Sequence, residues 1–383
     1  MKILHNASCW LPLTQTWMYT QLKYLPEGFE TQVACQTTDN LDQFGDVGSI
    51  YCLQERSSQF DYFMRRALRK LKLRRGLGWL KKPLRAFKPD IVHSHFGNIG
   101  WAVLPEIKNA IPHVVTFYGV DVSRLPKADP RWNDRYKELF EQVSGVLCEG
   151  AHMAACIREL GCEPDKIQVH RLGIRLDRIA FRPRAWDGME PLNVLLAGTF
   201  TEKKGLPYAI AALGRLASDV DLRVTVIGDA RASEADQAEK QKIQQSVKNS
   251  GMEDKVTFLG YQPYSILFEQ AYKHHIFLSP SVTAESGDTE GGAPVTIIEM
   301  AATGMPVVST KHCDIPGVIL DGETGLLAEE RNVESLYERL RWLVDNQDTW
   351  QDMTAKGRKY LDTEFDAAKQ GKKLANIYRR LCS

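Results

Sequence analysis

Short apolar runs that alternate with helix-like segments restrict the fold of this chain more than any other feature of its sequence. In the first half the runs are rich in β-branched residues and end at glycine, proline or polar residues; they span 2–8, 31–36, 49–54, 90–96, 113–119, 145–150 and 167–173. Strands separated by helices form a parallel sheet, because each new parallel strand needs a long crossover before it. The first half therefore predicts an α/β unit with a doubly wound sheet.

A second alternating set follows a break in the pattern at residues 181–191. This stretch (FRPRAWDGMEP) holds two prolines and a glycine and is typical of a linker. Beyond it we expect strands at 193–200, 222–229, 255–261, 275–281 and 306–310, helices at about 205–217, 234–249 and 294–303, and a helical tail over about 333–381. The sequence thus predicts two Rossmann-like domains, 1–180 and 181–363, that face each other across a cleft at the carboxyl ends of their strands, followed by a final segment, 364–383.

Composition and charge argue against several classes of protein. The chain has 383 residues and a formal net charge of +1, so no overall basic field is available for nucleic acid. It contains no apolar run of the roughly 18 residues that a membrane span requires, and its first residues do not predict a signal peptide. The eight cysteines form no C-x-x-C pair, and we expect reduced thiols in a cytoplasmic protein. Without zinc-like His/Cys spacing, we expect no metal and no cofactor.

Two segments of the second half contain the candidate ligand-binding residues. In AGTFTEKKGLPYAI (197–210), Lys203 and Lys204 lie in a loop between a strand and a helix, where a phosphate could meet both the lysines and the helix N-terminus. Taken alone, this pair is more simply explained as two solvated lysines.

The other segment is SGDTEGGAPVTIIEMAATGMPVVST (286–310). The amides of Gly291, Gly292 and Ala293 could cradle a diphosphate before a helix that we expect to begin around Pro294. Glu290 precedes this turn, and Glu299 lies inside an otherwise apolar helix, where a carboxylate needs a partner such as a ribose diol. The alternatives are a surface charge for Glu290 and a lysine partner for Glu299.

These segments resemble the donor site of retaining glycosyltransferases of family 4, which have the GT-B fold. The resemblance rests on the two glutamates, the small-residue helix with G-x-P-V-V, and the lysine-glycine loop at 203–205. It extends to DIVHSHF, to VVTFYGVDVS (114–123) and to the tail FDAAKQGKKLANIYRRL (365–381), and it is closest to members that build exopolysaccharide and lipopolysaccharide, the colanic-acid type included. Three departures stand out: eight residues instead of seven separate Glu290 from Glu299, and Thr199 and Gly317 stand where the family often has arginine and glutamate.

The resemblance implies a role for each matching residue. Glu290 holds hydroxyls of the donor sugar, Glu299 holds the ribose, and Lys204 neutralises the leaving diphosphate. Around them it implies a donor site completed by Thr199, Lys203, Phe258, Gly260, Tyr261, Gly291, Gly292, Ala293, Pro294 and Val295. The last helix is expected to pack back on the first domain.

Acceptor-side residues are expected in the first domain, namely Thr14, His95, Tyr118 and Asp121. His95 follows His93 on one face of a strand and stands at its end. The resemblance implies that His95 approaches the sugar, and we count it with Lys204 and Glu290 as catalytic. The alternatives are a structural histidine and, for Asp121, a helix or turn cap.

The predicted reaction moves a hexose-type sugar from a UDP-sugar or GDP-sugar to a saccharide or lipid-linked acceptor with retained anomeric configuration. Two other functions stay open, a non-hydrolysing sugar-nucleotide epimerase and a catalytically silent protein that binds sugar nucleotides. Thr199 and the shifted glutamate spacing keep the silent protein in consideration. Turnover of a sugar nucleotide with release of nucleoside diphosphate separates all three.

Residues 60–88 form a strongly basic segment. Eleven lysines and arginines face a single acidic residue, Asp61, and the apolar residues recur at helical spacing. Such a segment suits an anionic membrane surface, which predicts a peripheral protein on the inner face of the plasma membrane. The alternative is a helix that packs its apolar stripe on the sheet. Nucleic acid is a poor third partner, because no aromatic stacking platform accompanies the charges.

Overall fold

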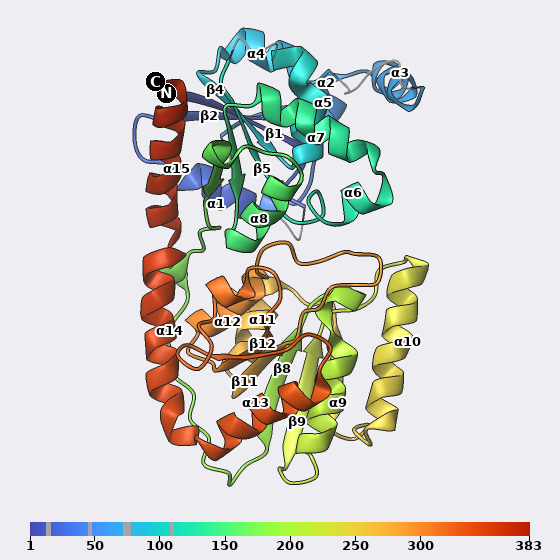
Figure 1. Ribbon diagram of the computed structural model, residues 1–383, viewed down its shortest axis with the longest axis vertical. Helices are drawn as coiled ribbons and strands as arrows, with labels where there is room; N and C mark the ends of the chain where they lie inside the picture. Colours follow the sequence, from blue (N-terminus) through green and yellow to red (C-terminus); the bar gives the residue numbers. More distant parts are fainter. Residues whose placement is uncertain (13–16, 45–47, 72–77, 108–110) are drawn as a thin grey trace. The chain divides into compact units, whose positions relative to one another are not determined.

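The computed structural model describes residues 1–12, 17–44, 48–71, 78–107 and 111–383. The chain divides into two compact units, Met1–Arg175 with Glu364–Ser383, and Leu176–Thr363 (Figure 1). Each unit is built on its own parallel sheet, and each is treated separately below.

The first unit contains a seven-stranded sheet in the order β3-β2-β1-β4-β5-β6-β7. Its strands are β1 Lys2–Trp10, β2 Glu30–Thr38, β3 Ser49–Cys52, β4 Ile91–His95, β5 His113–Thr116, β6 Gly145–Cys148 and β7 Ile167–Val169. Every neighbouring pair among them is parallel, as the alternating pattern predicted. The residues of β4, β5 and β6 are all buried, which explains why these strands are apolar without alternation.

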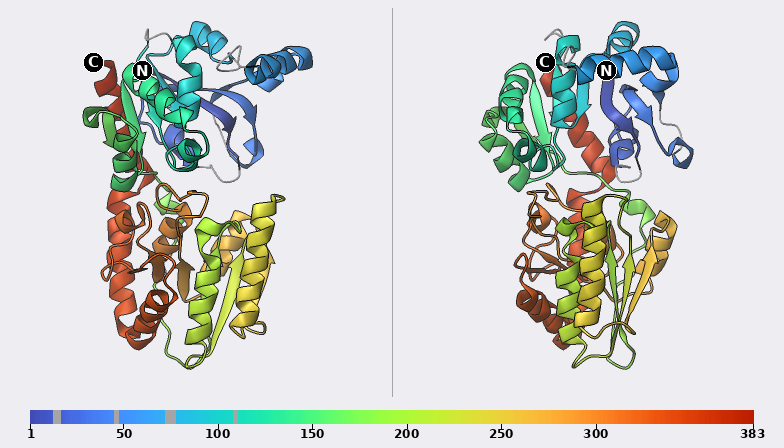
Figure 2. Two further views of the ribbon diagram at one scale, coloured as in Figure 1. Left: turned by 45° about the vertical axis from the view of Figure 1, so that its right-hand side comes forward. Right: turned by 90° about the vertical axis from the view of Figure 1, so that its right-hand side faces the viewer.

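The helices of this unit are α1 Trp17–Lys23, α2 Leu53–Arg56, α3 Gln59–Lys70, α4 Lys81–Phe87, α5 Gly97–Ile107, α6 Arg124–Ala128, α7 Arg131–Gln142, α8 Ala151–Glu159 and α15 Ala367–Cys382. Val115 packs with residues of α5 and α7, whereas its neighbour Val114 packs with Leu374 and Tyr378 of α15. Successive strand residues point to opposite faces, so α15 covers the face opposite α5 and α7. The prediction that the last helix packs on the first domain is confirmed, and α15 also contacts α1 (Figure 2).

The second unit contains a six-stranded parallel sheet in the order β10-β9-β8-β11-β12-β13. The strands are β8 Leu192–Ala197, β9 Leu222–Ile227, β10 Val256–Gly260, β11 Ile276–Ser279, β12 Val307–Thr310 and β13 Leu326–Ala328, and the helices are α9 Leu206–Leu216, α10 Glu234–Asn249, α11 Tyr264–Ala271, α12 Val295–Ala302, α13 Val333–Asp345 and α14 Trp350–Glu364. Strand β13 and helix α11 were not predicted.

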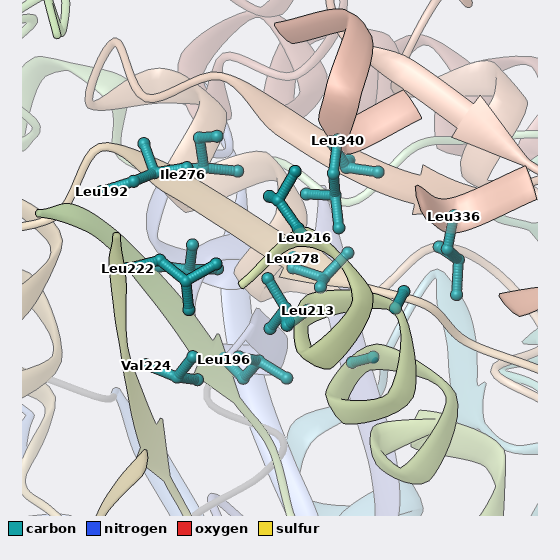
Figure 3. Packing of buried hydrophobic residues seen from close by; sticks show 14 of the residues in the cluster. Leu192, Leu196, Leu213, Leu216, Leu222, Val224, Ile276, Leu278, Leu336 and Leu340 are labelled. Carbon is teal, nitrogen blue, oxygen red and sulfur yellow. The ribbon is translucent and has the colours of Figure 1, made fainter. Parts of the chain in front are cut away.

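The core of the second unit lies between the sheet and helices α9 and α13. Leucines 213 and 216 of α9 and 336 and 340 of α13 meet the side chains of β8, β9 and β11 (Figure 3). All of these leucines are fully buried, and each buried leucine contributes about 1.5–3 kcal/mol to stability. This packing fixes the strands whose carboxyl ends carry the site described below.

Residues 181–191 do not form the loose linker that their composition suggested. The backbone amides of Arg182 and Arg184 donate to the carbonyl oxygens of Thr303 and Gly304. The Arg184 guanidinium is buried and donates to the carbonyl oxygen of Ala271 at 2.8 Å, and burial lowers its pKa to about 10. The prediction of a linker here is wrong, because Arg184 ties the segment into the second unit.

The tail over 333–381 is helical, as the sequence predicted, and two breaks divide it into α13, α14 and α15. At the first break, Asn346 donates its side-chain amide to the carbonyl oxygen of Trp342. At the second, Ala367 donates its amide to the carbonyl oxygen of Ile174, and the Asp366 side chain caps α15 through the amide of Lys369. These local hydrogen bonds compete with helix continuation.

Gly371 tests the packing of α15 within the first unit. A Cβ at this position would lie 1.9 Å from the carbonyl oxygen of Tyr24. Glycine to alanine inside a helix ordinarily stabilises by up to about 1 kcal/mol, but here we expect Gly371→Ala to lower the free energy of unfolding by about 1–3 kcal/mol because the backbones must separate. Urea denaturation measures the change.

The matched control is Gly357→Ala in α14, where the new Cβ would meet its nearest atom, the carbonyl oxygen of Thr324, at an ordinary 3.4 Å. This variant should be as stable as the wild type or more so. Equal stability of the two variants would contradict the close approach of α15 to Tyr24.

Candidate active site

Glycines end the three strands β8, β9 and β10 at the carboxyl edge of the second sheet. Gly228 donates its amide to the carbonyl oxygen of Gly260 at 2.8 Å, and a Cβ on Gly228 would lie 2.0 Å from the carbonyl oxygen of Gly198. The three backbones therefore approach each other more closely than side chains would allow. Parallel sheets bind ligands at this edge.

A close backbone contact at Gly205 also positions Lys203 and Lys204, the two lysines predicted from the sequence. Lys203 and Lys204 end a short turn, and Gly205 follows in the left-handed region with φ of 62°. A Cβ on Gly205 would lie 2.0 Å from the carbonyl oxygen of Pro280, in the segment that follows β11. Only glycine fits here, and the lysines consequently lie against the loop that carries Glu290.

Lys204 and Glu290 form a short ion pair. Lys204 Nζ lies 2.8 Å from Glu290 Oε1, and the Ser281 hydroxyl donates to the same oxygen at 3.0 Å. The Glu290 side chain is only 7% exposed. Burial by itself would raise the pKa of Glu290, but the charges of Lys204 and Lys203 outweigh it, so the pKa lies below its usual value. Glu290 is thus a buried, ionised carboxylate at neutral pH.

Lys203 has partners of its own. Its Nζ lies 3.4 Å from the carboxylate of Asp288 and donates to the carbonyl oxygen of Thr289 at 3.0 Å. The two neighbouring lysines are therefore fixed by different parts of one acidic loop. Asp288, like Ser281, was not among the predicted site residues.

The extra residue between the two glutamates is accommodated at Gly291, which has φ of 76°. The bulge leaves Glu290 against Lys204, but it also turns the Gly291 amide onto the Thr289 hydroxyl at 3.2 Å. For Gly291 the prediction of a free amide is wrong. Helix α12 begins at Val295, with Pro294 as its N-cap, one residue later than expected. Gly292 and Ala293 lie between the bulge and the helix.

Glu299 lies on α12 and is buried, and it has the partner that its apolar surroundings demand. The hydroxyl of Tyr264 donates to Glu299 Oε1 at 2.5 Å. One partner of Glu299 is therefore a tyrosine on α11. Phe258 and Tyr261, which precede Tyr264 in the sequence and belong to the predicted donor site, have exposed rings. Thr199 accepts the amide of Thr201 through its carbonyl oxygen.

In the first unit, His95 is enclosed by the protein. Its side chain is fully buried, Nε2 lies 3.1 Å from His5 Nδ1, and Nδ1 lies 2.7 Å from the hydroxyl of Tyr118. Burial lowers the pKa of His95 to about 3, so the ring is neutral. This contradicts the prediction that His95 reaches out to a sugar, and it agrees with the structural alternative.

His5, His93 and His95 form a cluster whose ligand-type atoms all lie within 4.8 Å of one another, a spacing that a metal ion could use. His93 bonds Tyr378 and Thr116, and only Nε2 of His5 among the six ring nitrogens has no hydrogen-bond partner. The other five nitrogens are committed, so the cluster is a hydrogen-bonded network in the core. The expectation of no metal requirement remains a prediction.

Asp121 and Tyr118 lie at the carboxyl edge of the first sheet. The carboxylate of Asp121 is buried and accepts the amides of Gly97, Tyr118 and Gly119 at 2.8–3.0 Å. Burial raises the pKa of Asp121 to about 6, and these hydrogen bonds oppose the shift. Asp121 therefore joins the loops after β4 and β5, which is the capping alternative.

Tyr118 is buried, and its ring lies against Trp17 at a tilt of 37°, with the centroids 4.1 Å apart. Trp17 was not predicted, because its segment carries no distinctive pattern. Thr14 lies outside the residues that the structure describes.

Comparison with known proteins assigns both units. The family model for "Glycosyltransferase Family 4" matches residues 15–178, and the model for "Glycosyl transferases group 1" matches residues 181–360. The amylovoran biosynthesis glycosyltransferase AmsK of Erwinia amylovora is 32% identical over 79% of this chain and 72% of its own length. The chain belongs to glycosyltransferase family 4.

Other proteins support this family 4 assignment. WcaL of Salmonella typhimurium, whose name assigns it to colanic acid biosynthesis, is 29% identical over 77% of this chain and 71% of its own length. Among solved structures, the sucrose-phosphate synthase of Thermosynechococcus elongatus has a TM-score of 0.77 at 17% identity, covering 100% of this chain and 99% of the other. HepE of Anabaena, solved with UDP and glucose, has a TM-score of 0.75 at 16% identity, covering 99% and 100%. At these identities the structures bear on the fold alone, which is GT-B.

No described helix of this glycosyltransferase combines the length and the apolar character that crossing a membrane requires.

Buried neutral histidines predict that the first unit of this glycosyltransferase is sensitive to acid. Burial lowers the pKa of five histidines there: His5, His93, His95, His113 and His170. The unfolded chain binds protons near pH 6.5 and the folded chain does not, so stability is present above pH 6.5 and is lost as the pH falls toward the folded pKa values. At pH 5.5 each ring whose folded pKa stays well below that pH is expected to cost about 1.4 kcal/mol of stability.

Urea unfolding at pH 7.5 and pH 5.5 measures this loss. His113→Gln keeps a hydrogen-bonding side chain beside Ser94, whose hydroxyl lies 2.8 Å from the ring, but removes one titrating group. The variant should therefore lose about 1.4 kcal/mol less than the wild type between the two pH values. Identical losses would show that His113 titrates in the folded state.

Proposed function

We propose that this family 4 protein is a retaining transferase that moves a hexose-type sugar from a nucleoside diphosphate sugar to a saccharide or lipid-linked acceptor in cell-surface polysaccharide synthesis. The observation that carries the proposal is the Lys204–Glu290 ion pair at the carboxyl edge of the second sheet, beside the glycine-ended strands. The names of AmsK and WcaL, which refer to amylovoran and colanic acid, support the polysaccharide, and the HepE complex with UDP and glucose supports the donor class.

The donor is proposed to bind across the residues of this edge. Lys204 meets the diphosphate while it stays beside Glu290, and the ionised Glu290 accepts hydroxyl protons of the sugar. Glu299 accepts the ribose diol, for which Tyr264 stands in as the hydroxyl donor in the free protein. Phe258 and Tyr261 offer exposed rings to the base.

Catalysis is then positioning together with stabilisation of departing charge. Retention is explained if the acceptor hydroxyl arrives on the face that the diphosphate leaves, and no protein carboxylate need become a nucleophile. Lys204 is the main cation for the leaving group. Lys203 is already held by Asp288, so it does not replace the arginine that the family often has where Thr199 stands. We propose that no metal is needed.

A catalytically silent sugar-nucleotide-binding protein is the second candidate, and the Gly291 bulge and Thr199 favour it. It would bind the same ligands through the same residues. Release of nucleoside diphosphate in the presence of an acceptor distinguishes the enzyme from this candidate.

Nucleotide binding is tested by melting-temperature shifts with UDP, GDP, ADP and TDP, followed by the matching nucleotide sugars. A ligand at about 100 times its dissociation constant adds about 2.7 kcal/mol of stability. We expect one nucleotide to give a clear shift in the wild type and little or none in Lys204→Met, because the diphosphate loses its cation.

Lys203→Met is the matched control, since its partners lie on the acidic loop, and it should keep most of the shift. If no nucleotide stabilises the wild type, or if both variants respond as the wild type does, the proposed donor site is wrong.

We also propose that α3 binds an anionic membrane surface. Its apolar residues Phe60, Phe63 and Met64, with Leu71 just after the helix, are exposed, Phe60 to 74%. They recur at helical spacing, and Figure 1 and the left view of Figure 2 show α3 projecting from the first unit. The alternative in which this stripe packs on the sheet is therefore wrong for α3.

The surface proposed to bind the membrane is smaller than the segment 60–88 that the sequence predicted. Trp79, Leu80 and Phe87 are buried with Leu4 and Val92 in the core, so the part around α4 has no apolar face to offer. The charge balance of α3 remains favourable, because its acidic residue, Asp61, is paired with Arg65 at 2.8 Å. Each lysine or arginine near an anionic surface contributes about 1 kcal/mol.

Sedimentation with liposomes tests this surface. The wild type should sediment with vesicles that contain phosphatidylglycerol at low salt and should be released at high salt. Phe60→Ser/Phe63→Ser should lose most of the binding, because these rings supply the apolar contact.

Met189→Ser is the control, since Met189 is 89% exposed but lies in the second unit. Failure of the wild type to sediment with anionic vesicles at low salt would overturn the membrane proposal and leave the donor site untouched.

A further inference from the structure

A buried histidine and a glutamate from two other loops hold the backbone of Glu290. His312 follows β12 and is fully buried. Its Nε2 accepts the backbone amide of Glu290 at 3.2 Å, and its Nδ1 lies 2.7 Å from Glu330 Oε1. Glu330 follows β13, so three loops of the second unit meet at this ring.

The donors around the ring determine where its proton lies. The amide of Glu290 can only donate, so Nε2 must present its lone pair. Burial raises the pKa of Cys313 to about 12, and its protonated thiol lies 3.2 Å from the same Nε2. The proton of the neutral ring therefore lies on Nδ1 and is donated to the carboxylate of Glu330. This tautomer is the one that a carboxylate partner favours.

Glu330 ties together both ends of the loop that carries Glu290. Its Oε2 accepts the amide of Thr283 at 2.7 Å, near the start of the loop, and its Oε1 holds His312, which binds the amide at the end. Burial by itself would raise the pKa of Glu330, but the Thr283 amide and His312 outweigh it and the pKa lies below its usual value. The carboxylate is ionised and both of its oxygens take part.

We propose that His312 and Glu330 are positioning residues that fix the 283–290 loop, so that the Glu290 carboxylate keeps its place beside Lys204 for the donor sugar. This inference rests on the proposed function. The loop needs such an anchor because the inserted residue at Gly291–Gly292 adds backbone freedom next to Glu290. The His312 bond restrains the backbone on the near side of that insertion.

Kinetics with the sugar nucleotide that the wild type turns over provides the first test. His312→Leu removes the acceptor for the Glu290 amide, and we expect kcat to fall about 10- to 100-fold, because misplacement of a binding group has effects of that size. Binding of the bare nucleoside diphosphate should not change, since Glu290 is assigned to the sugar. His312→Gln, whose side chain offers both a carbonyl oxygen and an N–H, should recover much of kcat.

A double-mutant cycle shows whether His312 acts through Glu290. Glu290→Ala combined with His312→Leu should be no slower than Glu290→Ala alone. The control is His274→Leu, another buried histidine of the second unit, held by the carbonyl oxygen of Gln270 and the hydroxyl of Thr225. It should lower stability and leave kcat unchanged. Wild-type kcat in His312→Leu, or additive losses in the cycle, would overturn the inference while the proposed function stands.

Hydrogen exchange in the free protein gives a readout that does not depend on turnover. Amides of residues 283–291 should exchange at least tenfold faster in His312→Leu and in Glu330→Gln than in the wild type, and His274→Leu should not change them. Unchanged exchange in both loop variants would overturn the inference. A wild type that transfers no sugar but shows this exchange pattern would refute the proposed function and retain the anchoring of the loop.

Discussion

A buried carboxylate needs a counter-charge, and much of the second unit is arranged to provide one for Glu290. An isolated ionised carboxylate away from water costs many kcal/mol, so Glu290 can stay charged only if a cation lies close to it. Lys204 is brought there by the contact between Gly205 and Pro280, which in turn depends on β8 and β11 being neighbours in the sheet. The leucine core beneath these strands therefore stabilises the charged loops above them.

The same constraint explains why the loop tolerates an extra residue. The inserted glycine takes the left-handed conformation, and the loop ends are fixed by side chains from beyond β12 and β13. Glu290 is then held through its backbone by His312 and through its carboxylate by Lys204 and Ser281. Two independent attachments compensate for the freedom that a second glycine introduces.

The sequence predicted those parts of the molecule whose pattern is local. Strand positions followed from short apolar runs, whereas the roles of Lys204 and Glu290 were implied by the resemblance of their segments to the family 4 donor site. His312 and Glu330 could not be found in this way. The contact of these two residues with the Glu290 loop depends on the strand order β11-β12-β13, and β13, which precedes Glu330, was not predicted from the sequence.

The predictions for His95 and for the basic segment 60–88 failed in part for the same reason, because contacts between segments that are distant in the sequence determine which side chains are exposed. The alternation of β4 correctly placed His93 and His95 on one face, but Tyr378 of α15 and His5 of β1 enclose that face. The basic segment has one composition throughout, yet its two parts differ in the structure. Trp79 and Phe87 reach the core beside β1 and β4, whereas the aromatic residues Phe60 and Phe63 of α3 find no such partner.

Each unit buries a carboxylate at the carboxyl edge of its sheet, Asp121 in the first unit and Glu290 in the second. The two carboxylates differ in their partners, and this difference distinguishes a structural role from a role in ligand binding. Asp121 receives three backbone amides on its two oxygens and pairs with no cation among the residues that the structure describes, so burial raises its pKa and its bonding capacity is used within the fold. Glu290 has a lysine, so its pKa is lowered, and the contacts to Lys204 and Ser281 both fall on Oε1. Its other oxygen takes part in neither contact. An ionised carboxylate with an oxygen outside its ion pair can accept a hydroxyl group, and this is why the second edge, and not the first, carries the argument for sugar binding.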